Sequence, residues 1–91
     1  MVVNFEDKKF PNKFKNKFYI LEELIKENMK VKTYNFKYDI DFDMFIVFLN
    51  FGFFSINIKF KSEDFIYLRV EEIYFKISKE VESYLLKMIY K

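Results

Sequence analysis

Hydrophobic residues recur at helical spacing in the first third of the chain. Behind Pro11, one side of the sequence is apolar and contains Phe14, Phe18, Leu21, Leu24, Ile25 and Met29. This spacing is typical of an amphipathic helix, and proline is tolerated at a first helical position because its missing N–H would be unpaired there. We therefore predict a helix over residues 12–29, preceded by an irregular or extended arm over residues 1–10.

A strict alternation of apolar and polar residues follows. Its apolar positions are Tyr34, Phe36, Tyr38, Ile40, Phe42 and Met44, and its polar positions are Thr33, Asn35, Lys37, Asp39, Asp41 and Asp43. This period of two predicts a strand with one face in water. A turn near residues 39–43 is the alternative. Residues 45–49 are apolar at every position, which is typical of a strand buried on both faces.

Asn50-Phe51-Gly52 is the only turn marked by glycine. Alternation then resumes and predicts a strand over 54–61, with Phe54, Ile56, Ile58 and Phe60 pointing inward. Ser62-Glu63-Asp64 is the next turn signal.

Residues 65–77 fit two structures. The aromatic and β-branched run over 65–70 favours a strand that ends in a bulge or turn at Glu71-Glu72. The spacing of Ile66, Val70, Ile73 and Ile77 fits a helix that Ser62 would cap. We favour the strand.

The carboxyl-terminal segment has one clean apolar face, and Ser78 can cap a helix there. That face contains Val81, Tyr84, Leu85, Met88 and Ile89. The predicted order is α-β-β-β-β-α. Short connections between successive strands predict an antiparallel meander sheet with both helices packed on one face. We therefore predict the α+β class and a single domain over residues 1–91.

Membrane insertion and secretion are not expected. The longest uncharged run, from Met44 to Ile58, is shorter than the roughly 20 apolar residues that a spanning helix needs. The first residues lack a basic start followed by an apolar stretch, so we expect no secretory signal and a cytoplasmic protein.

Side chains that commonly perform catalysis are missing, because the chain has no His and no Cys and only one Gly. A histidine base, a cysteine nucleophile and a glycine-rich phosphate loop are therefore excluded. The spacing of Asp39, Asp41 and Asp43 is similar to the start of a calcium loop, but Met44 stands where that loop needs Gly. We expect a non-enzymatic protein with no catalytic residues, no cofactor and no metal site.

The composition and charge indicate a binding role. Phe, Ile, Lys, Asn and Tyr make up 53 of 91 residues, which points to an AT-rich genome. Residues 1–37 carry a net charge of +4, residues 38–72 carry −4 and residues 73–91 carry +2. Segregated charge can orient a partner, and the surplus of Phe and Tyr favours a protein interface.

The sequence therefore favours a small inhibitor that binds another protein. A phage or mobile-element product that blocks a host nucleic-acid-handling complex, as anti-CRISPR proteins do, would present acidic and aromatic residues to a basic groove. The candidate protein-binding residues are Asp39, Asp41, Asp43, Glu63, Asp64, Glu71, Glu72 and Tyr67.

Two alternatives remain open. The first is direct nucleic-acid binding through the basic amino-terminal run, in which Lys8, Lys9, Lys13, Lys15 and Lys17 alternate with aromatic residues. The second is a homodimeric structural or antitoxin-like protein whose apolar sheet is its own interface.

Overall fold

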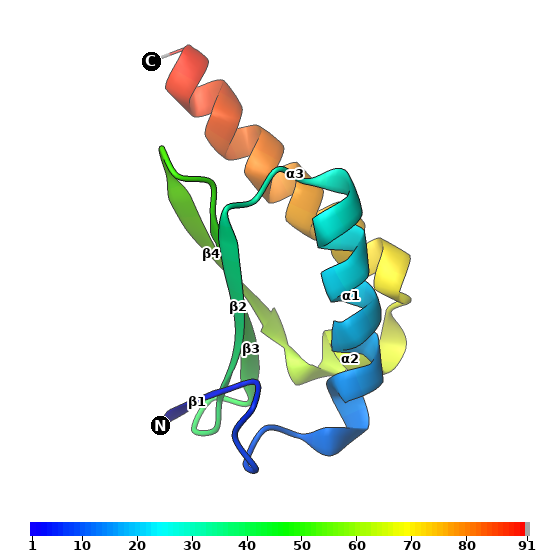
Figure 1. Cartoon of the computed structure of the whole chain (residues 1–91). Helices are drawn as coiled ribbons and strands as arrows, with labels where there is room; N and C mark the ends of the chain where they lie inside the picture. The colour runs from blue at the N-terminus through cyan, green and yellow to red at the C-terminus, as the bar shows by residue number, and fades with distance from the viewer. Residues whose placement is uncertain (91) are drawn as a thin grey trace.

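The protein has the α+β fold that the sequence predicts, a four-stranded antiparallel meander sheet with helices on one face (Figure 1). The computed structural model describes residues 1–90. Its elements in chain order are β1 (Val2–Asn4), the 3₁₀ helix η1 (Asn12–Phe14), α1 (Lys15–Asn28), β2 (Thr33–Asp39), β3 (Met44–Asn50), β4 (Ser55–Lys61), α2 (Ser62–Tyr67) and α3 (Val70–Ile89).

The strand β1 lies in the segment predicted as an irregular or extended arm. It pairs with the end of β2, with Val3 opposite Tyr38, and gives the sheet the order β1-β2-β3-β4. Only Val3 of this strand is buried. A three-residue edge strand carries too short a pattern to be recognised from sequence, and here its pairing partner stabilises it.

The alternation predicted to continue to Met44 ends at Asp39, and the chain reverses over residues 40–43. The turn changes the side on which the later residues lie. Phe42, predicted to point inward, is 75% exposed at the turn. Met44 lies on the outer face, because its neighbour Phe45 on β3 is fully buried.

The prediction of a strand over 65–70 is wrong, because residues 62–67 form α2 and residues from Val70 onward form α3. The helical spacing of Val70, Ile73 and Ile77 prevails, since all three side chains are buried against the core. Ser78 consequently lies inside α3, where its hydroxyl donates to the Phe75 carbonyl oxygen at 2.8 Å instead of capping the helix.

One aromatic core lies between the sheet and the helices. Half of the fourteen phenylalanines belong to it: Phe10, Phe14, Phe18, Phe36, Phe45, Phe60 and Phe65. At its centre the ring of Phe18 stacks on that of Phe65 with centroids 4.5 Å apart, and Phe45 meets both rings at 4.8–5.0 Å. The high phenylalanine content is therefore largely a matter of packing.

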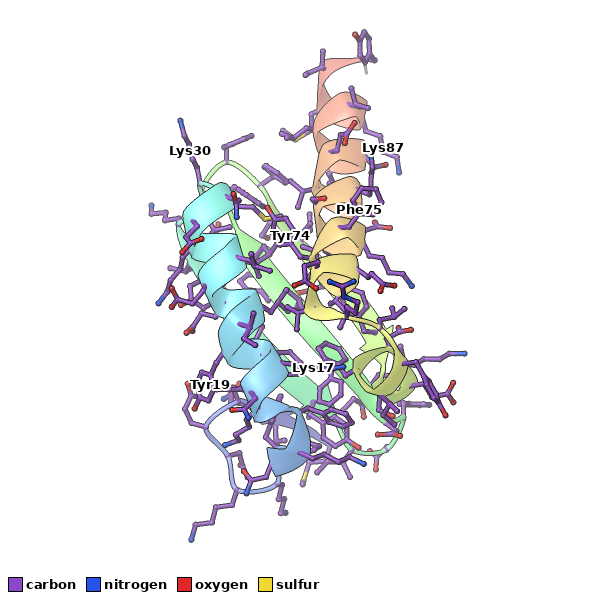
Figure 2. The ribbon with its side chains drawn as sticks, turned by 90° about the vertical axis from the view of Figure 1, so that its right-hand side faces the viewer. Lys17, Tyr19, Lys30, Tyr74, Phe75 and Lys87 are labelled. Carbon is purple, nitrogen blue, oxygen red and sulfur yellow. The ribbon has the colours of Figure 1, made fainter. Side chains whose placement is uncertain are left out.

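The helices α1 and α3 lie side by side over the inner face of the sheet (Figure 2), as predicted. No layer covers the outer face within the described residues (Figure 1). None of the helices among residues 1–90 is long and apolar enough to cross a membrane.

Candidate functional site

The carboxyl-terminal half of α3 extends past the rest of the molecule (Figure 1). With 20 residues this helix is about 30 Å long, whereas a seven-residue strand such as β3 spans only about 24 Å. Val81 is the last buried residue of α3. The apolar side chains beyond it are exposed: Tyr84, Leu85, Leu86, Met88, Ile89 and Tyr90.

The loop between β3 and β4 places aromatic rings beside this part of α3. Phe51 and Phe54 stack with centroids 4.7 Å apart, and Phe54 lies nearly parallel to Tyr84 at 6.2 Å. The ring of Phe53 extends outward and is 70% exposed. The loop can turn this sharply because Gly52 adopts a φ of 94°, a left-handed conformation that suits glycine.

The loop and α3 together form one apolar surface. Its residues are Phe53, Phe54, Tyr84, Leu85, Met88 and Ile89, and we call it the α3–loop surface. A hollow of about 350 Å³ opens in it, and its lining residues include Phe53, Leu85 and Met29, which directly follows α1. Contiguous exposed apolar patches on small proteins commonly mark interaction sites.

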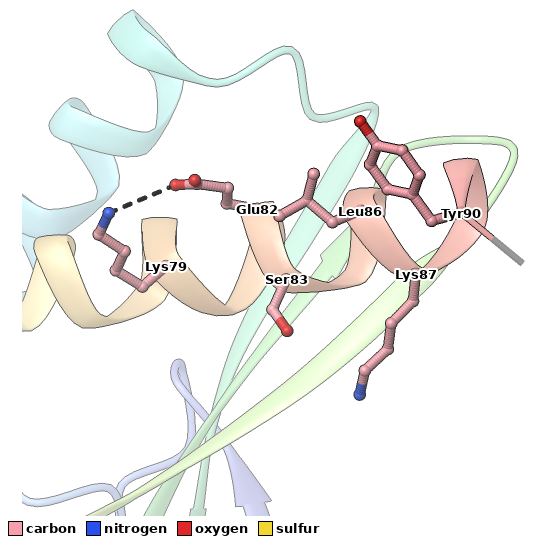
Figure 3. A pocket seen from close by; sticks show the side chains of 6 residues that line it. All are labelled: Lys79, Glu82, Ser83, Leu86, Lys87 and Tyr90. Carbon is pink, nitrogen blue, oxygen red and sulfur yellow. Dashed lines mark ion pairs between the residues drawn. The ribbon is translucent and has the colours of Figure 1, made fainter.

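The outer side of the same helix has a different character. A shallow depression of about 450 Å³ is lined by Lys79, Glu82, Ser83, Leu86 and Lys87 of α3 and by its C-cap residue Tyr90 (Figure 3). An ion pair joins Lys79 to Glu82 at 3.5 Å. Since a single helix supplies every wall, this depression is an open helix surface and cannot enclose a small ligand as binding pockets do.

The three aspartates predicted to share a strand face lie in the β2–β3 turn, and each has a partner within the molecule. Asp39 accepts hydrogen bonds from the backbone N–H groups of Asp41 and Phe42 at 3.1 and 3.4 Å. The Asp41 carboxylate pairs with the Met1 amino group. Asp43 accepts from the hydroxyls of Ser62 and Tyr38 at 2.6 and 2.5 Å. These carboxylates stabilise the turn through contacts within the molecule.

Asp43 connects this turn to the start of α2. The hydrogen bond from Ser62, followed by that from Tyr38, holds the pKa of the Asp43 carboxyl below its usual range. The same contact raises the pKa of Tyr38 to about 12. Asp43 also has a φ of 50°, a left-handed conformation that aspartate and asparagine tolerate better than most residues.

We expect Asp43→Asn to lower the free energy of unfolding by about 1 kcal/mol at neutral pH, because it removes the charge from two charge-assisted hydrogen bonds that water partly screens. Since folding lowers this pKa, the stabilisation is present above about pH 4 and is lost as the pH falls through the folded-state value. Urea titrations of the parent and the Asp43→Asn variant at pH 7 and at about pH 3 measure this stabilisation. If the difference in unfolding free energy between the two proteins does not shrink at the lower pH, the Asp43 carboxylate does not stabilise the turn.

The remaining acidic candidates lie around α2 and the start of α3. Glu63 and Asp64 occupy the first turn of α2, and Glu71 and Glu72 occupy the first turn of α3. Carboxylates favour these positions because they interact with the helix dipole. Tyr67, at the end of α2, is 80% exposed. What these four acids share in the structure is a position in the first turn of a helix.

The basic run predicted as a nucleic-acid surface does not present aromatic rings to a ligand. Its interleaved rings of Phe10, Phe14 and Phe18 are buried in the core. The ammonium group of Lys17 donates to the carbonyl oxygens of Phe65 and Leu68 at 2.5 and 2.8 Å. Lys13 and Lys15 lie over the rings of Phe14 and Phe5, and Lys8 and Lys9 are exposed in the preceding loop.

Sequence periodicity indicates which aromatic and aliphatic residues are exposed in some cases and fails to do so in others. Phe53, Tyr67, Tyr90 and Tyr19 fall off the main apolar faces of the sequence, and all four are exposed. Phe51 and Tyr74 show the same signal but pack against the core. The apolar face of the carboxyl-terminal segment predicts that Leu85, Met88 and Ile89 face the core. Helical spacing is the same on both halves of α3, so it cannot show that these residues are exposed.

Among residues 1–90, no group of three or more His, Cys, Asp or Glu side chains is arranged to hold a metal ion. Comparisons of the chain with protein-family models, with curated proteins and with solved structures find no match.

Proposed function

We propose that this chain is a small protein-binding module that docks a partner protein through the α3–loop surface. The observation that carries the proposal is the exposure of a continuous apolar surface on α3 and the β3–β4 loop. Ile89 and Phe53 are each 70% exposed. A fully buried aromatic side chain removes about 150–250 Å² from water, so covering Phe53 would remove substantial apolar area from water.

The chemistry of the surface suits protein recognition. Aromatic residues and methionine are enriched at the centres of protein interfaces, and Phe53, Tyr84 and Met88 supply both kinds. Lys30 lines the hollow, and the ammonium group of Lys87 lies 6.0 Å from the ring centroid of Tyr84, so lysines border the apolar centre. A polar rim around an apolar centre is the usual arrangement of such interfaces.

Inhibition of a host nucleic-acid-handling complex remains our proposal for the consequence of binding. A chain without His or Cys would act by occupying a surface of its target. We favour the apolar surface over the acidic turn as the contact, because the carboxylates of Asp39, Asp41 and Asp43 already have partners within the molecule.

The double variant Phe53→Ser/Ile89→Ser tests the docking surface. Both side chains are largely exposed, so the free energy of unfolding should change by less than about 1 kcal/mol. Loss of two apolar anchors should weaken partner binding at least about tenfold. Affinity capture from host lysate, with nuclease present and read by mass spectrometry, identifies proteins that the parent chain binds and the variant does not. Light scattering over a range of concentrations shows whether a second copy is the partner.

A matched control is Ile20→Ser/Phe42→Ser, which removes two exposed apolar side chains elsewhere and should leave binding unchanged. A charge-reversed variant, Glu71→Lys/Glu72→Lys, tests the acidic surface directly. If binding survives in the Phe53/Ile89 variant and is lost in the Glu71/Glu72 variant, the acidic surface is the docking site and the α3–loop surface is not.

A further inference from the structure

The outer face of the sheet has an ordered arrangement of side chains that the protein-binding proposal does not use. On this face the central strand β3 presents Met44, Ile46 and Phe48, which are half-buried. The neighbouring strands contribute polar residues at matching positions. Lys37 on β2 and Lys59 on β4 stand directly opposite Ile46, and Asn35 and Asn57 stand directly opposite Phe48.

A row of three cross-strand neighbours therefore repeats along the sheet. One row is Lys37-Ile46-Lys59, and the next, about 7 Å along the strands, is Asn35-Phe48-Asn57. Across a row, the two lysines or the two asparagines are separated by two strand spacings, about 10 Å. Side-chain amides thus flank the ring of Phe48, and the ammonium groups of two lysines flank Ile46 in the adjacent row.

The net charge of this face is positive. Lys61 lies opposite Met44 and adds a third lysine, whereas Asp39 is the single carboxylate in the three rows that run from Met44 to Phe48. Asp39 is engaged by the turn backbone. Within the described part of the chain, none of these three lysines forms an ion pair with a carboxylate.

From this arrangement we propose that the outer face of the sheet binds single-stranded nucleic acid. The ring of Phe48 stacks on a base, the amides of Asn35 and Asn57 form hydrogen bonds with base edges, and the lysines of the adjacent rows contact phosphates. Base stacking on aromatic side chains beside a positively charged groove is the general means by which proteins hold single strands. Bases in a duplex are stacked on one another and cannot reach such a ring.

Other occupants fit the face less well. A second copy docked on it would bring lysines against lysines, and like charges in an interface are unfavourable. Lysines on an edge strand also discourage further strands from pairing, which would account for Lys59 and Lys61. That explanation does not extend to Lys37, which has a paired strand on both sides, nor to the two asparagines that flank Phe48.

Fluorescence anisotropy with a labelled oligothymidylate and a labelled oligouridylate of about 12 nucleotides tests the proposal. We expect saturable binding of both at low salt and much weaker binding of a duplex. Phe48→Thr keeps a good strand former and removes the ring, and should raise Kd about tenfold. Lys37→Gln/Lys59→Gln should also raise Kd. The slope of log affinity against log salt should be near −2 for three phosphate contacts and become flatter by about 1.4 in this variant.

The matched control is Lys8→Gln/Lys9→Gln, which removes the same charge from the amino-terminal basic run and should change Kd less than about threefold. Circular dichroism and urea unfolding confirm that each variant is folded. The proposal is overturned if no saturable binding occurs below about 100 μM at low salt. It is also overturned if the Lys8/Lys9 variant loses binding while the sheet variants bind as the parent does. Competition by polyglutamate as strong as that by unlabelled oligonucleotide would indicate that the ligand is an acidic protein, and would likewise overturn the proposal. None of these measurements involves Phe53 or Ile89, so the result is independent of the α3–loop surface.

Discussion

Replacing Phe45 with alanine is expected to lower the free energy of unfolding by about 3–5 kcal/mol. Phe45 is completely buried on β3. Its ring packs at 5.2, 5.0 and 4.8 Å from the rings of Phe14, Phe18 and Phe65. The substitution removes the apolar surface of one ring and also leaves a cavity among several others, and both effects reduce stability.

Urea unfolding followed by far-UV circular dichroism measures this loss. Small domains have about 5–15 kcal/mol of stability in total, so a weakly stable parent would be largely unfolded by this change. Phe45→Leu keeps most of the volume and should give a smaller loss that remains measurable. Phe53→Ala is the matched control, since that ring is 70% exposed. A loss for Phe45→Ala no greater than that for Phe53→Ala would show that the aromatic core is not assembled as described.

The second large effect is expected for Lys17→Met, which should lower the free energy of unfolding by about 2 kcal/mol. The ammonium group of Lys17 on α1 donates to the carbonyl oxygens of Phe65 and Leu68, where α2 ends (Figure 2). These carbonyls would otherwise lack a partner in a partly buried position, and a positive charge is favourable at a helix carboxyl end. Methionine keeps the apolar stem of the side chain, so the variant reports on the hydrogen bonds.

Lys26→Met on the same helix is the control. Its ammonium group pairs with Glu22 at 3.8 Å where water screens the charges, so Lys26→Met should lower the free energy of unfolding much less than Lys17→Met does. Chemical denaturation of both variants gives the comparison, and amide hydrogen exchange shows whether protection is lost first near residues 65–70. Equal losses for the two variants would mean that Lys17 does not stabilise the junction between α2 and α3.

Much of the fold follows from local patterns because those patterns reflect burial on one side of a regular element. The apolar spacing behind Pro11 predicted the first helix, which begins as η1 and ends at Asn28. Alternation predicted β2 and β4, and Gly52 marked the connection between β3 and β4. In each case the side that is apolar in the sequence faces the same core.

The errors occur where a local pattern fits two structures. Residues 65–70 have the composition of a strand, but the buried position of Phe65 against Phe18 and the hydrogen bonds from Lys17 stabilise a helix. Both partners are distant in the sequence. The fourth strand comes instead from Val2–Asn4, whose pairing with β2 also depends on a contact between distant segments.

For the candidate sites, too, local sequence patterns predict some features and contacts between distant segments decide the others. The sequence by itself determined that the chain lacks His and Cys, that its aromatic residues exceed those on its predicted core faces, and that α3 has an apolar side. Only the tertiary structure decided which of these side chains are exposed. Periodicity specifies the direction in which Leu85 and Ile89 point, but exposure depends on α3 being longer than the sheet beneath it. Asp39, Asp41 and Asp43 are equally visible in the sequence, yet the turn that they stabilise uses their carboxylates, because hydrogen-bond partners are set by the path of the folded chain.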